Sequence, residues 1–262
     1  DMITCEMMGR LCNQMFIAAT AHSLALDNDD KAVFPYGISG ITPTDKETVL
    51  HRNTIFRNLE YTKDLSFIKN VHIEPPDQSY AQIEYKPDLL IRGYFQSEKH
   101  FVHNRQAILD LFRPQQAALS FLDQKYSEII NSKKFASVHI RRGDYLKYAD
   151  FHAIMGKEYY DEAMSRFPKS TKFVFFSDDI EWCKETFGPR HIYIENQEDI
   201  LDLYLMSKIK NNIIANSSFS WWGAWLSELK DKKVLTPPVW FGPKNTHLTM
   251  KDLIPETWEM VK

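Results

Sequence analysis

VHIRRGDY, residues Val138–Tyr145, begins in an apolar run and ends in a polar turn. The apolar residues before the arginines are few enough for one buried strand, which we expect over Phe135–Ile140. Gly143 then turns the chain into a loop, so Arg141 and Arg142 fall where the strand ends. Open α/β sheets bind ligands outside the carboxyl ends of their strands, and arginine carries a fixed charge on a planar fork that fits phosphate oxygens. The stretch therefore predicts an α/β sheet with a phosphate or diphosphate site at its edge.

Paired arginines also occur on ordinary protein surfaces, and Arg142-Gly143-Asp144 spells a cell-adhesion tripeptide that often arises by chance. The neighbouring residues favour a ligand site. His139 precedes the pair by two residues, and strand alternation places it on the same face as Arg141.

Strands and helices alternate through the second half of the chain. The sequence predicts strands over 135–140, 172–177, 191–194, 212–215 and 233–236, and helices over 157–167, 180–186, 199–208 and 220–229. We expect Asn196 to cap the third of these helices. Such alternation is typical of a parallel sheet covered by helices on both faces, and the strands are as continuously apolar as that burial requires.

The first half of the chain begins as strand, loop and helix. We expect a strand over 2–7, a loop over 9–14 and a helix over 15–26, then an irregular region from 31 to about 94 and helices over 104–111 and 115–131. The chain is thus predicted to form two α/β lobes, 1–132 and 133–262, divided in the polar stretch Asn131–Lys134. The active site of such a protein is expected in the cleft between its lobes.

Composition excludes several classes of protein. The net charge of -3 argues against a nucleic-acid partner, since proteins that bind nucleic acid are usually basic. The cysteines Cys5, Cys12 and Cys183 form neither a disulfide framework nor a zinc pattern, which favours a reducing compartment. Neither an apolar run of roughly 20 residues nor a signal peptide is visible, so we expect a cytoplasmic protein. The first residue is Asp1, which leaves a removed leader or anchor open.

Small polar residues follow two further predicted strands. Asn216-Ser217-Ser218-Phe219-Ser220 leaves a strand and opens a helix, where backbone N–H groups and the helix dipole favour an anion. Simple N-capping of the helix is the alternative interpretation, but an N-cap needs only one small polar residue and this segment contains four. Asp178-Asp179 could hold a metal against a diphosphate, but the arginines already supply positive charge, so no metal is expected. Asp178 could instead bind a sugar or base, or cap the next helix.

Two other features have competing interpretations. Asp202 could accept hydrogen bonds from a guanine edge, but its spacing from Asp199 favours a solvated helix face. The tryptophans of Ser220–Leu226 could stack on a sugar, but aromatics at helical spacing more often pack a core, and we expect the core.

Four segments together resemble one known family. They occur in the order Gly9–Phe16, His139–Tyr145, Phe175–Asp179 and Asn216–Leu226. This ordered set is similar to the α-1,2-fucosyltransferases of glycosyltransferase family 11, and the compact chain is more similar to bacterial members than to Golgi ones. The resemblance implies a GT-B-like fold of two Rossmann-type lobes with the active site between them. It also implies an inverting enzyme that moves L-fucose from GDP-fucose to the 2-hydroxyl of a terminal β-galactose of a glycan, without a required metal or other cofactor.

The resemblance also implies roles for individual residues. The lobe 133–262 would bind the donor and the lobe 1–132 the acceptor. The implied donor-site residues are Arg141, Arg142, Asp178, Asp202, Asn216, Ser217, Ser218, Phe219, Asn13 and Gln14. Of these, Asp202 would bind guanine. The family loop usually carries glycine where this chain has Cys12, and often where it has Arg10, which leaves the placement of Asn13 and Gln14 open.

The expected chemistry follows from charge. Arg142, with His139 and Asp144, is predicted to act on the charge of the departing GDP and on the acceptor proton. Asp144, Asp150 and His152 remain alternative bases, and Asp144 could instead form an ion pair with Arg142. Two alternative hypotheses remain. The chain could be a transferase for GDP-mannose or a UDP-sugar, or a non-catalytic carbohydrate-binding protein. Peripheral association with a membrane and the oligomeric state stay open.

Overall fold

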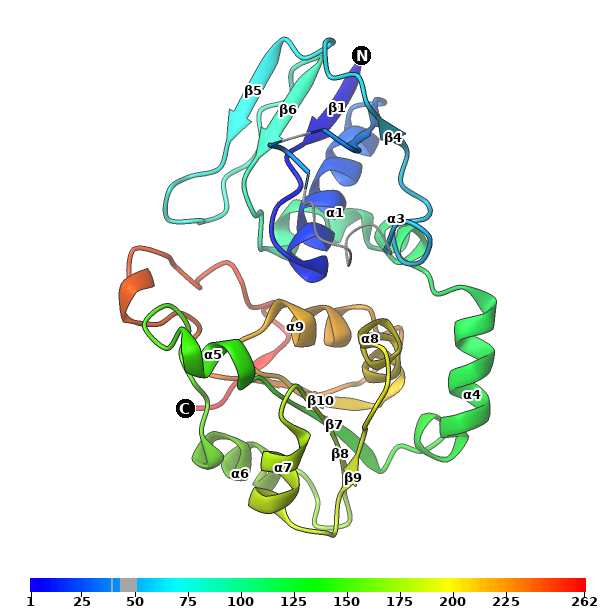
Figure 1. Cartoon of the computed structure of the whole chain (residues 1–262), viewed down its shortest axis with the longest axis vertical. Coiled ribbons are helices and arrows are strands. Elements are labelled where there is room, and N and C mark those ends of the chain that lie inside the picture. The colour runs from blue at the N-terminus through cyan, green and yellow to red at the C-terminus, as the bar shows by residue number, and fades with distance from the viewer. Residues whose placement is uncertain (39, 43–50) are drawn as a thin grey trace. The chain divides into compact units, whose positions relative to one another are not determined.

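The computed structural model describes residues 1–38, 40–42 and 51–262, which divide into two compact units (Figure 1). The first unit is Asp1–Pro114 with His247–Pro255, and the second is Gln115–Thr246 with Glu256–Lys262. The division thus comes earlier than the one expected near residue 132. Helix α4 (Gln116–Ile130) belongs to the second unit, where the Tyr126 hydroxyl donates to Gln197 Oε1 at 2.6 Å.

A parallel sheet organises the described part of the first unit, with the strand order β2-β1-β6-β5. These strands are β1 (Met2–Cys5), β2 (Lys31–Ala32), β5 (Asn70–Ile73) and β6 (Leu89–Arg92). Strands β3 (Phe34–Pro35) and β4 (Tyr61–Thr62) pair separately, and η1 (Glu98–His100), η2 (Val102–Asn104) and α3 (Arg105–Leu111) follow β6. The expected strand at the N-terminus is confirmed. The region from 31 to 94 was predicted only as irregular, because its strands are two to four residues long.

Helix α1 (Leu11–Asp27) begins four residues earlier than expected, so the predicted loop over 9–14 is wrong from Leu11 onward. The turn before it depends on Gly9, whose φ of +72° is in the left-handed region. A Cβ on Gly9 would lie 2.4 Å from Asn13 Nδ2. A glycine at this position therefore lets the helix begin early, with Asn13 packed against the turn.

A six-stranded parallel sheet forms the described second unit, in the order β12-β11-β10-β7-β8-β9. Its strands are β7 (Phe135–Ile140), β8 (Lys172–Ser177), β9 (Ile192–Tyr193), β10 (Asn211–Ile213), β11 (Val234–Thr236) and β12 (Glu259–Met260). The predicted parallel sheet is confirmed, and β7 and β8 have the predicted bounds. Strand β12 was not predicted, since it has two residues, both exposed.

The strand order reverses beside β7. The chain runs from β7 outward to β8 and β9, then returns to the other side of β7 as β10 before continuing to β11 and β12. Such a switch point leaves a crevice outside the carboxyl ends of the two strands that flank it, because their connections run to opposite faces. The strand that ends in the two arginines is one of these two.

Helices cover both faces of this sheet (Figure 1). Helices α6 (Lys157–Ser165) and α7 (Ile180–Phe187) lie on one face, and α8 (Asp199–Lys208) and α9 (Ser218–Trp225) on the other. Trp221, Trp222 and Trp225 are at most 3% exposed, which confirms the expected core role and removes the sugar-stacking interpretation. The predicted N-cap Asn196 is wrong, because its φ is +53° and Glu198 takes that position.

Candidate functional site

The loops after β7, β8 and β10 are joined by hydrogen bonds. After β7 the chain forms α5 (Gly143–Lys147) at once, where a loop was expected. Asp178, which follows β8, accepts from the backbone N–H groups of Arg142 at 2.9 Å and Gly143 at 2.8 Å. The Tyr145 hydroxyl donates to the carbonyl of Asn216, which follows β10, at 2.9 Å. The predicted residues from three separate segments therefore lie together in the second unit.

Asp178 fixes the turn that carries the arginines. Besides the two backbone amides, its carboxylate accepts from Arg141 Nη1 at 3.1 Å. A Cβ on Gly143 would lie 2.5 Å from Asp178 Oδ2, so the carboxylate occupies the space that any other side chain would need. Helix α7, which follows β8, is capped by Asp179 and not by Asp178. The Asp179 carboxylate accepts from Trp182 N.

Arg141 is compensated by carboxylates. It contacts Asp144 Oδ2 at 2.8 Å as well as Asp178, and its side chain is 21% exposed. Asp144, for which an ion pair with Arg142 was the alternative role, lies one helical turn beyond Arg141 and forms its ion pair with that residue. Arg141 is thus an anchor within the protein.

Arg142 has different surroundings. Its guanidinium carbon lies 3.9 Å from the centre of the Trp182 ring, and its Nε is 3.4 Å from Asp179 Oδ2. Within the described residues, no hydrogen bond engages its two Nη nitrogens. A stacked guanidinium with open terminal nitrogens is suited to bind an anion in the plane of its fork. Trp182 was missed from the sequence, since a tryptophan inside a short helix gives no signal of its own.

The loop into α9 caps that helix with Ser217, which is the N-capping alternative that the sequence left open. Ser217 is the N-cap and accepts from Phe219 N at 3.2 Å, while Ser218 and Phe219 form the first, partly exposed turn. Asn216 is 2% exposed and donates to the carbonyls of Ala153 at 2.7 Å and Trp240 at 2.9 Å. Asn216 therefore holds the loop in place.

His139 lies behind this loop. Its ring centre is 5.3 Å from that of Phe219, and the residue is 6% exposed. Burial, with the charge of Arg141 in second place, lowers the pKa of His139 to about 3. Its Nδ1 has no hydrogen-bond partner among the residues that the structure describes. A neutral, buried imidazole of this kind favours a packing role over proton transfer at physiological pH.

Asp202 does not lie on a solvated face. It is partly buried in α8, and Gln197 Nε2 donates to its Oδ1 at 2.8 Å. Burial, aided by the charge of Asp199, raises the pKa of Asp202 to about 7. A desolvated carboxyl with a raised pKa is a candidate for ligand binding.

The candidate bases lie in α5 and in the segment that follows it. His152 stacks on Tyr145 with ring centres 4.2 Å apart, and burial, followed by the charge of Arg141, lowers its pKa. Asp150 is exposed and lies 3.3 Å from Lys244 Nζ. Asp144 keeps its contact with Arg141.

The predicted site residues of the first unit, Asn13 and Gln14, make side-chain hydrogen bonds to other residues of that unit. Asn13 Oδ1 accepts from Gln96 Nε2 at 3.0 Å, while the fully buried Gln14 donates to the carbonyl of Gly9 at 2.8 Å. The residues that depart from the family loop have ordinary backbones: Cys12 is helical and the φ of Arg10 is -86°. Neither position therefore needs glycine, and the loop keeps its form with the side chains present.

Among the described residues, no group of three or more histidine, cysteine, aspartate or glutamate side chains could hold a metal ion. In the same part of the chain, no helix is both long and apolar enough to cross a bilayer.

Residues 1–251 match the sequence model of a family described as "Glycosyl transferase family 11". The chain belongs to glycosyltransferase family 11. Among curated members, it is 35% identical over 190 residues to the O-antigen biosynthesis glycosyltransferase WbnK of Escherichia coli, covering 66% of this chain and 63% of that protein. It is 36% identical over 183 residues to an α-1,2-colitosyltransferase of Escherichia coli, covering 65% and 61%. This family 11 chain thus spans just over six-tenths of the length of these two relatives.

A mammalian relative is matched over more of the chain. The galactoside α-(1,2)-fucosyltransferase 2 of Oryctolagus cuniculus is 26% identical over 246 residues, covering 86% of this chain and 67% of that protein. Solved structures are similar in fold. The fucosyltransferase NodZ from Bradyrhizobium has a TM-score of 0.53 at 12% identity, covering 86% of this chain and 93% of that one. POFUT1 in complex with GDP-fucose has a TM-score of 0.52 at 14% identity, covering 90% and 97%. The family 11 chain thus shares their α/β fold with parallel sheets.

Proposed function

We propose that this chain transfers L-fucose from GDP-fucose to the 2-hydroxyl of a terminal β-galactose of a glycan, with inversion at the anomeric carbon and without a bound metal. Membership of glycosyltransferase family 11 supports the class of reaction. The names of its mammalian relatives, galactoside α-(1,2)-fucosyltransferases, support the donor sugar and the linkage. In this proposal the two units are the lobes of a GT-B-like enzyme, and the reaction takes place in a cleft between them.

One observation carries the donor assignment. Arg142, whose Nη nitrogens form no hydrogen bond within the described part of the chain, follows the strand next to the one that leads into α9. The start of α9 adds backbone N–H groups and the positive end of a helix dipole. The two strands flank the switch point of the sheet, which is where ligands of such folds bind. A diphosphate fits this combination of fixed charge and amide donors.

The reaction follows from that placement. The bond between the anomeric carbon of fucose and the diphosphate oxygen breaks, and both of its electrons leave with GDP. Meanwhile the sugar ring gains oxocarbenium character. Arg142 and the amides of α9 stabilise the added negative charge more in the transition state than in the ground state. The galactose 2-hydroxyl attacks the opposite face of the ring, and its proton leaves to a base among Asp144, Asp150 and His152.

The remaining residues position this machinery. Asp178 and Asp144 hold Arg141, and Arg141 keeps the turn that presents its neighbour. His139 supports Phe219 at the start of α9. Asp202, with Gln197 beside it, accepts from the N–H groups of guanine once it is ionised. A GDP-sugar is synthesised in the compartment that contains its nucleotide precursors. The proposal therefore retains the predicted cytoplasmic location.

The test is direct. The chain is incubated with GDP-fucose and N-acetyllactosamine, with and without EDTA, and the product is analysed by NMR. We expect an α-linked fucose on the 2-hydroxyl of galactose and equal rates in EDTA. Transfer to another hydroxyl, or loss of activity in EDTA that Mg²⁺ restores, would contradict the linkage or the metal independence respectively.

A colitosyl donor is the second candidate. The α-1,2-colitosyltransferase is 36% identical to this chain, whereas the rabbit fucosyltransferase is 26% identical over a longer alignment. Colitose is fucose without its 3-hydroxyl. A site that hydrogen-bonds a hydroxyl discriminates strongly against a substrate that lacks it, whereas an apolar site discriminates weakly. The ratio of kcat/KM for GDP-fucose and GDP-colitose therefore decides between the two donors.

A further inference from the structure

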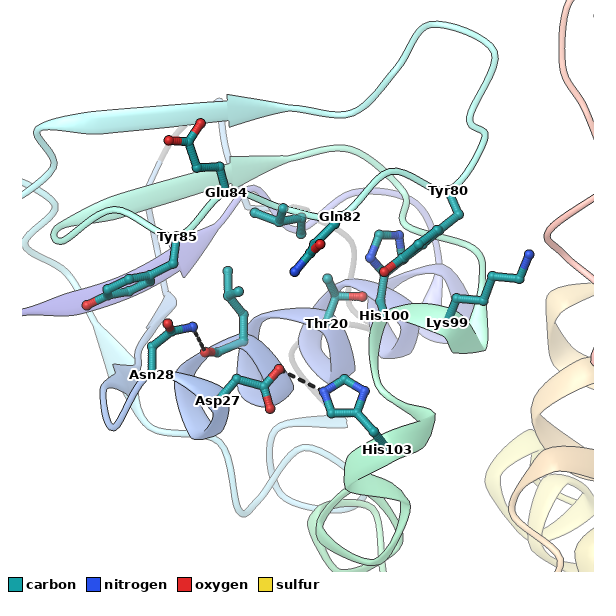
Figure 2. Close-up of a pocket in the computed structure, with 12 residues that line it drawn as sticks. Thr20, Asp27, Asn28, Tyr80, Gln82, Glu84, Tyr85, Lys99, His100 and His103 are labelled. Atoms are coloured by element: carbon teal, nitrogen blue, oxygen red, sulfur yellow. Dashed lines mark hydrogen bonds and ion pairs between the residues drawn. The ribbon is translucent and has the colours of Figure 1, made fainter.

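A cavity of about 650 Å³ lies within the first unit (Figure 2). Its walls are the second half of α1, the segment 80–85 that leads into β6, and residues of η1 and η2. This volume is in the range of small-molecule sites. None of the residues predicted for the donor lines it.

The cavity has no excess of cations, because the carboxylates of Asp27 and Glu84 line it together with Lys99. Asp27 Oδ2 lies 2.7 Å from His103 Nε2, and Lys99 forms an ion pair with Asp252. The His100 ring packs at a tilt against Tyr80 with ring centres 4.8 Å apart, and burial lowers the pKa of His100 to about 4, so it is neutral at physiological pH. A phosphate or nucleotide site would need an excess of cations, which these pairs do not provide. The lining therefore favours a neutral ligand.

The polar groups that line the cavity suit hydroxyls. The Gln82 amide, which can both donate and accept, points inward from the segment 80–85 (Figure 2). Opposite it lie Thr20 on α1 and Asn28 just after that helix, whose side chains donate to the carbonyls of Phe16 and Leu24. The Tyr80 and Tyr85 rings stand at the two ends. Aromatic rings that alternate with amides and hydroxyls match a ligand whose ring has an apolar face and a hydroxyl edge, which is the chemistry of a pyranose.

A predicted site residue, Asn13, lies on the helix that forms one wall of the cavity. Asn13, Thr20 and Asp27 are seven residues apart along α1, so they lie in one stripe on the same face of the helix. Thr20 is about 10 Å along the helix axis from Asn13. Gln96, which donates to Asn13, precedes Lys99 and His100 of the cavity wall by three and four residues. Asn13 and one wall of the cavity therefore belong to the same helix of the first unit.

We propose that this cavity is a glycan subsite, which binds a neutral sugar residue of the acceptor beyond the galactose that receives fucose. This rests on the proposed function. It adds that the chain selects acceptors longer than a disaccharide.

The experiment compares two acceptors with the same reacting end, N-acetyllactosamine and lacto-N-neotetraose. Gln82→Ala is the test variant. The Gln82 side chain is exposed, so its truncation should leave the fold intact. Lys86→Ala, an exposed position in the same segment outside the cavity, is the matched control. For the unaltered chain we expect a lower KM for the tetrasaccharide. Gln82→Ala should raise that KM roughly fivefold, the loss of about one hydrogen bond, and leave the KM of the disaccharide and the hydrolysis of GDP-fucose unchanged.

Equal KM values for the two acceptors in the unaltered chain, or an equal effect of Gln82→Ala on both, would overturn the subsite. Binding of the tetrasaccharide is also followed by saturation-transfer NMR, which needs no turnover. If the chain transferred no fucose to either acceptor, the proposed function would fail. Tetrasaccharide binding that Gln82→Ala weakens and Lys86→Ala preserves would then still support a glycan site here.

Discussion

Arg141 and Arg142 are adjacent in the sequence but differ in what surrounds them. Arg141 contacts the carboxylates of Asp144 and Asp178, whereas Arg142 is stacked on Trp182 with a single long contact to Asp179. A compensated guanidinium holds the protein together, and a stacked one with open nitrogens can bind a ligand. The two residues should therefore respond differently to substitution.

Arg142→Ala should lower kcat/KM for fucosyl transfer by about 100-fold or more, because it removes a donor that acts on transition-state charge. The melting temperature should change little. Arg141→Ala should instead lower the melting temperature, since it leaves Asp144 and Asp178 without their cation. Initial rates and thermal unfolding of both variants are the measurements. Near-normal turnover of Arg142→Ala would refute the diphosphate assignment.

Asp202 should make GDP binding depend on pH. Its folded pKa of about 7 lies above the ordinary carboxyl value, so Asp202 is largely protonated below pH 7 and then lacks the charge and the second acceptor oxygen with which the carboxylate would bind the guanine N–H groups. Affinity for GDP should rise with pH and level off above about pH 8. Calorimetric titration from pH 5.5 to 8.5 measures this. The same titration of Asp202→Asn is the control, because it measures the pH dependence that comes from the phosphates of GDP alone. If both proteins showed the same pH dependence, Asp202 would not bind guanine.

At the scale of elements, the strand exits depend on close packing between segments. The Asp178 carboxylate, from the loop after β8, fills the space beside Gly143 and binds two amides at the start of α5. The geometry of one loop is thus set by the side chain of another.

Gly143→Ala should destabilise the protein by about 1–3 kcal/mol, because its Cβ would displace the Asp178 carboxylate. Asp178→Ala removes that obstacle, so Gly143→Ala should cost less in the Asp178→Ala background. Urea unfolding of the two single variants and the double variant measures the coupling. Additive effects would show that the carboxylate does not restrict this position.

At the scale of the whole molecule, the chain enters the first unit twice. Residues 247–255 return to it after the second unit is almost complete. Asp252 ties this return in place: it is 7% exposed, accepts from Tyr80 N at 2.8 Å and forms an ion pair with Lys99.

Asp252→Ala should destabilise the first unit by about 1–3 kcal/mol, since Tyr80 N–H loses its acceptor and Lys99 its anion. Affinity for GDP should stay the same, because the proposed donor site belongs to the second unit. Chemical denaturation and calorimetry with GDP check the two halves of this prediction. Asp252→Asn, which keeps an oxygen acceptor, is the control and should cost less. A loss of GDP affinity in proportion to stability would contradict the assignment of the donor to the second unit.

Local pattern determined a large part of this protein. The apolar run of β7 and the alternation after it are properties of neighbouring residues, and they were enough to predict the parallel sheet and the bounds of β7 and β8. The tryptophans of α9 were likewise expected in the core from their helical spacing. Very short strands such as β12 gave no such signal, because two residues carry no period.

Only the tertiary structure decided which residues meet. Arg141 and Asp178 are 37 positions apart, and the distance between them depends on the pairing of β7 with β8. The same holds for Trp182 under Arg142, for the burial that raises the pKa of Asp202, and for the cavity beside α1. The sequence determined which segments become strands and helices, because backbone conformation and burial period are local. The order of strands at the switch point, and with it the surroundings of each charge, depends on contacts between segments far apart in the chain.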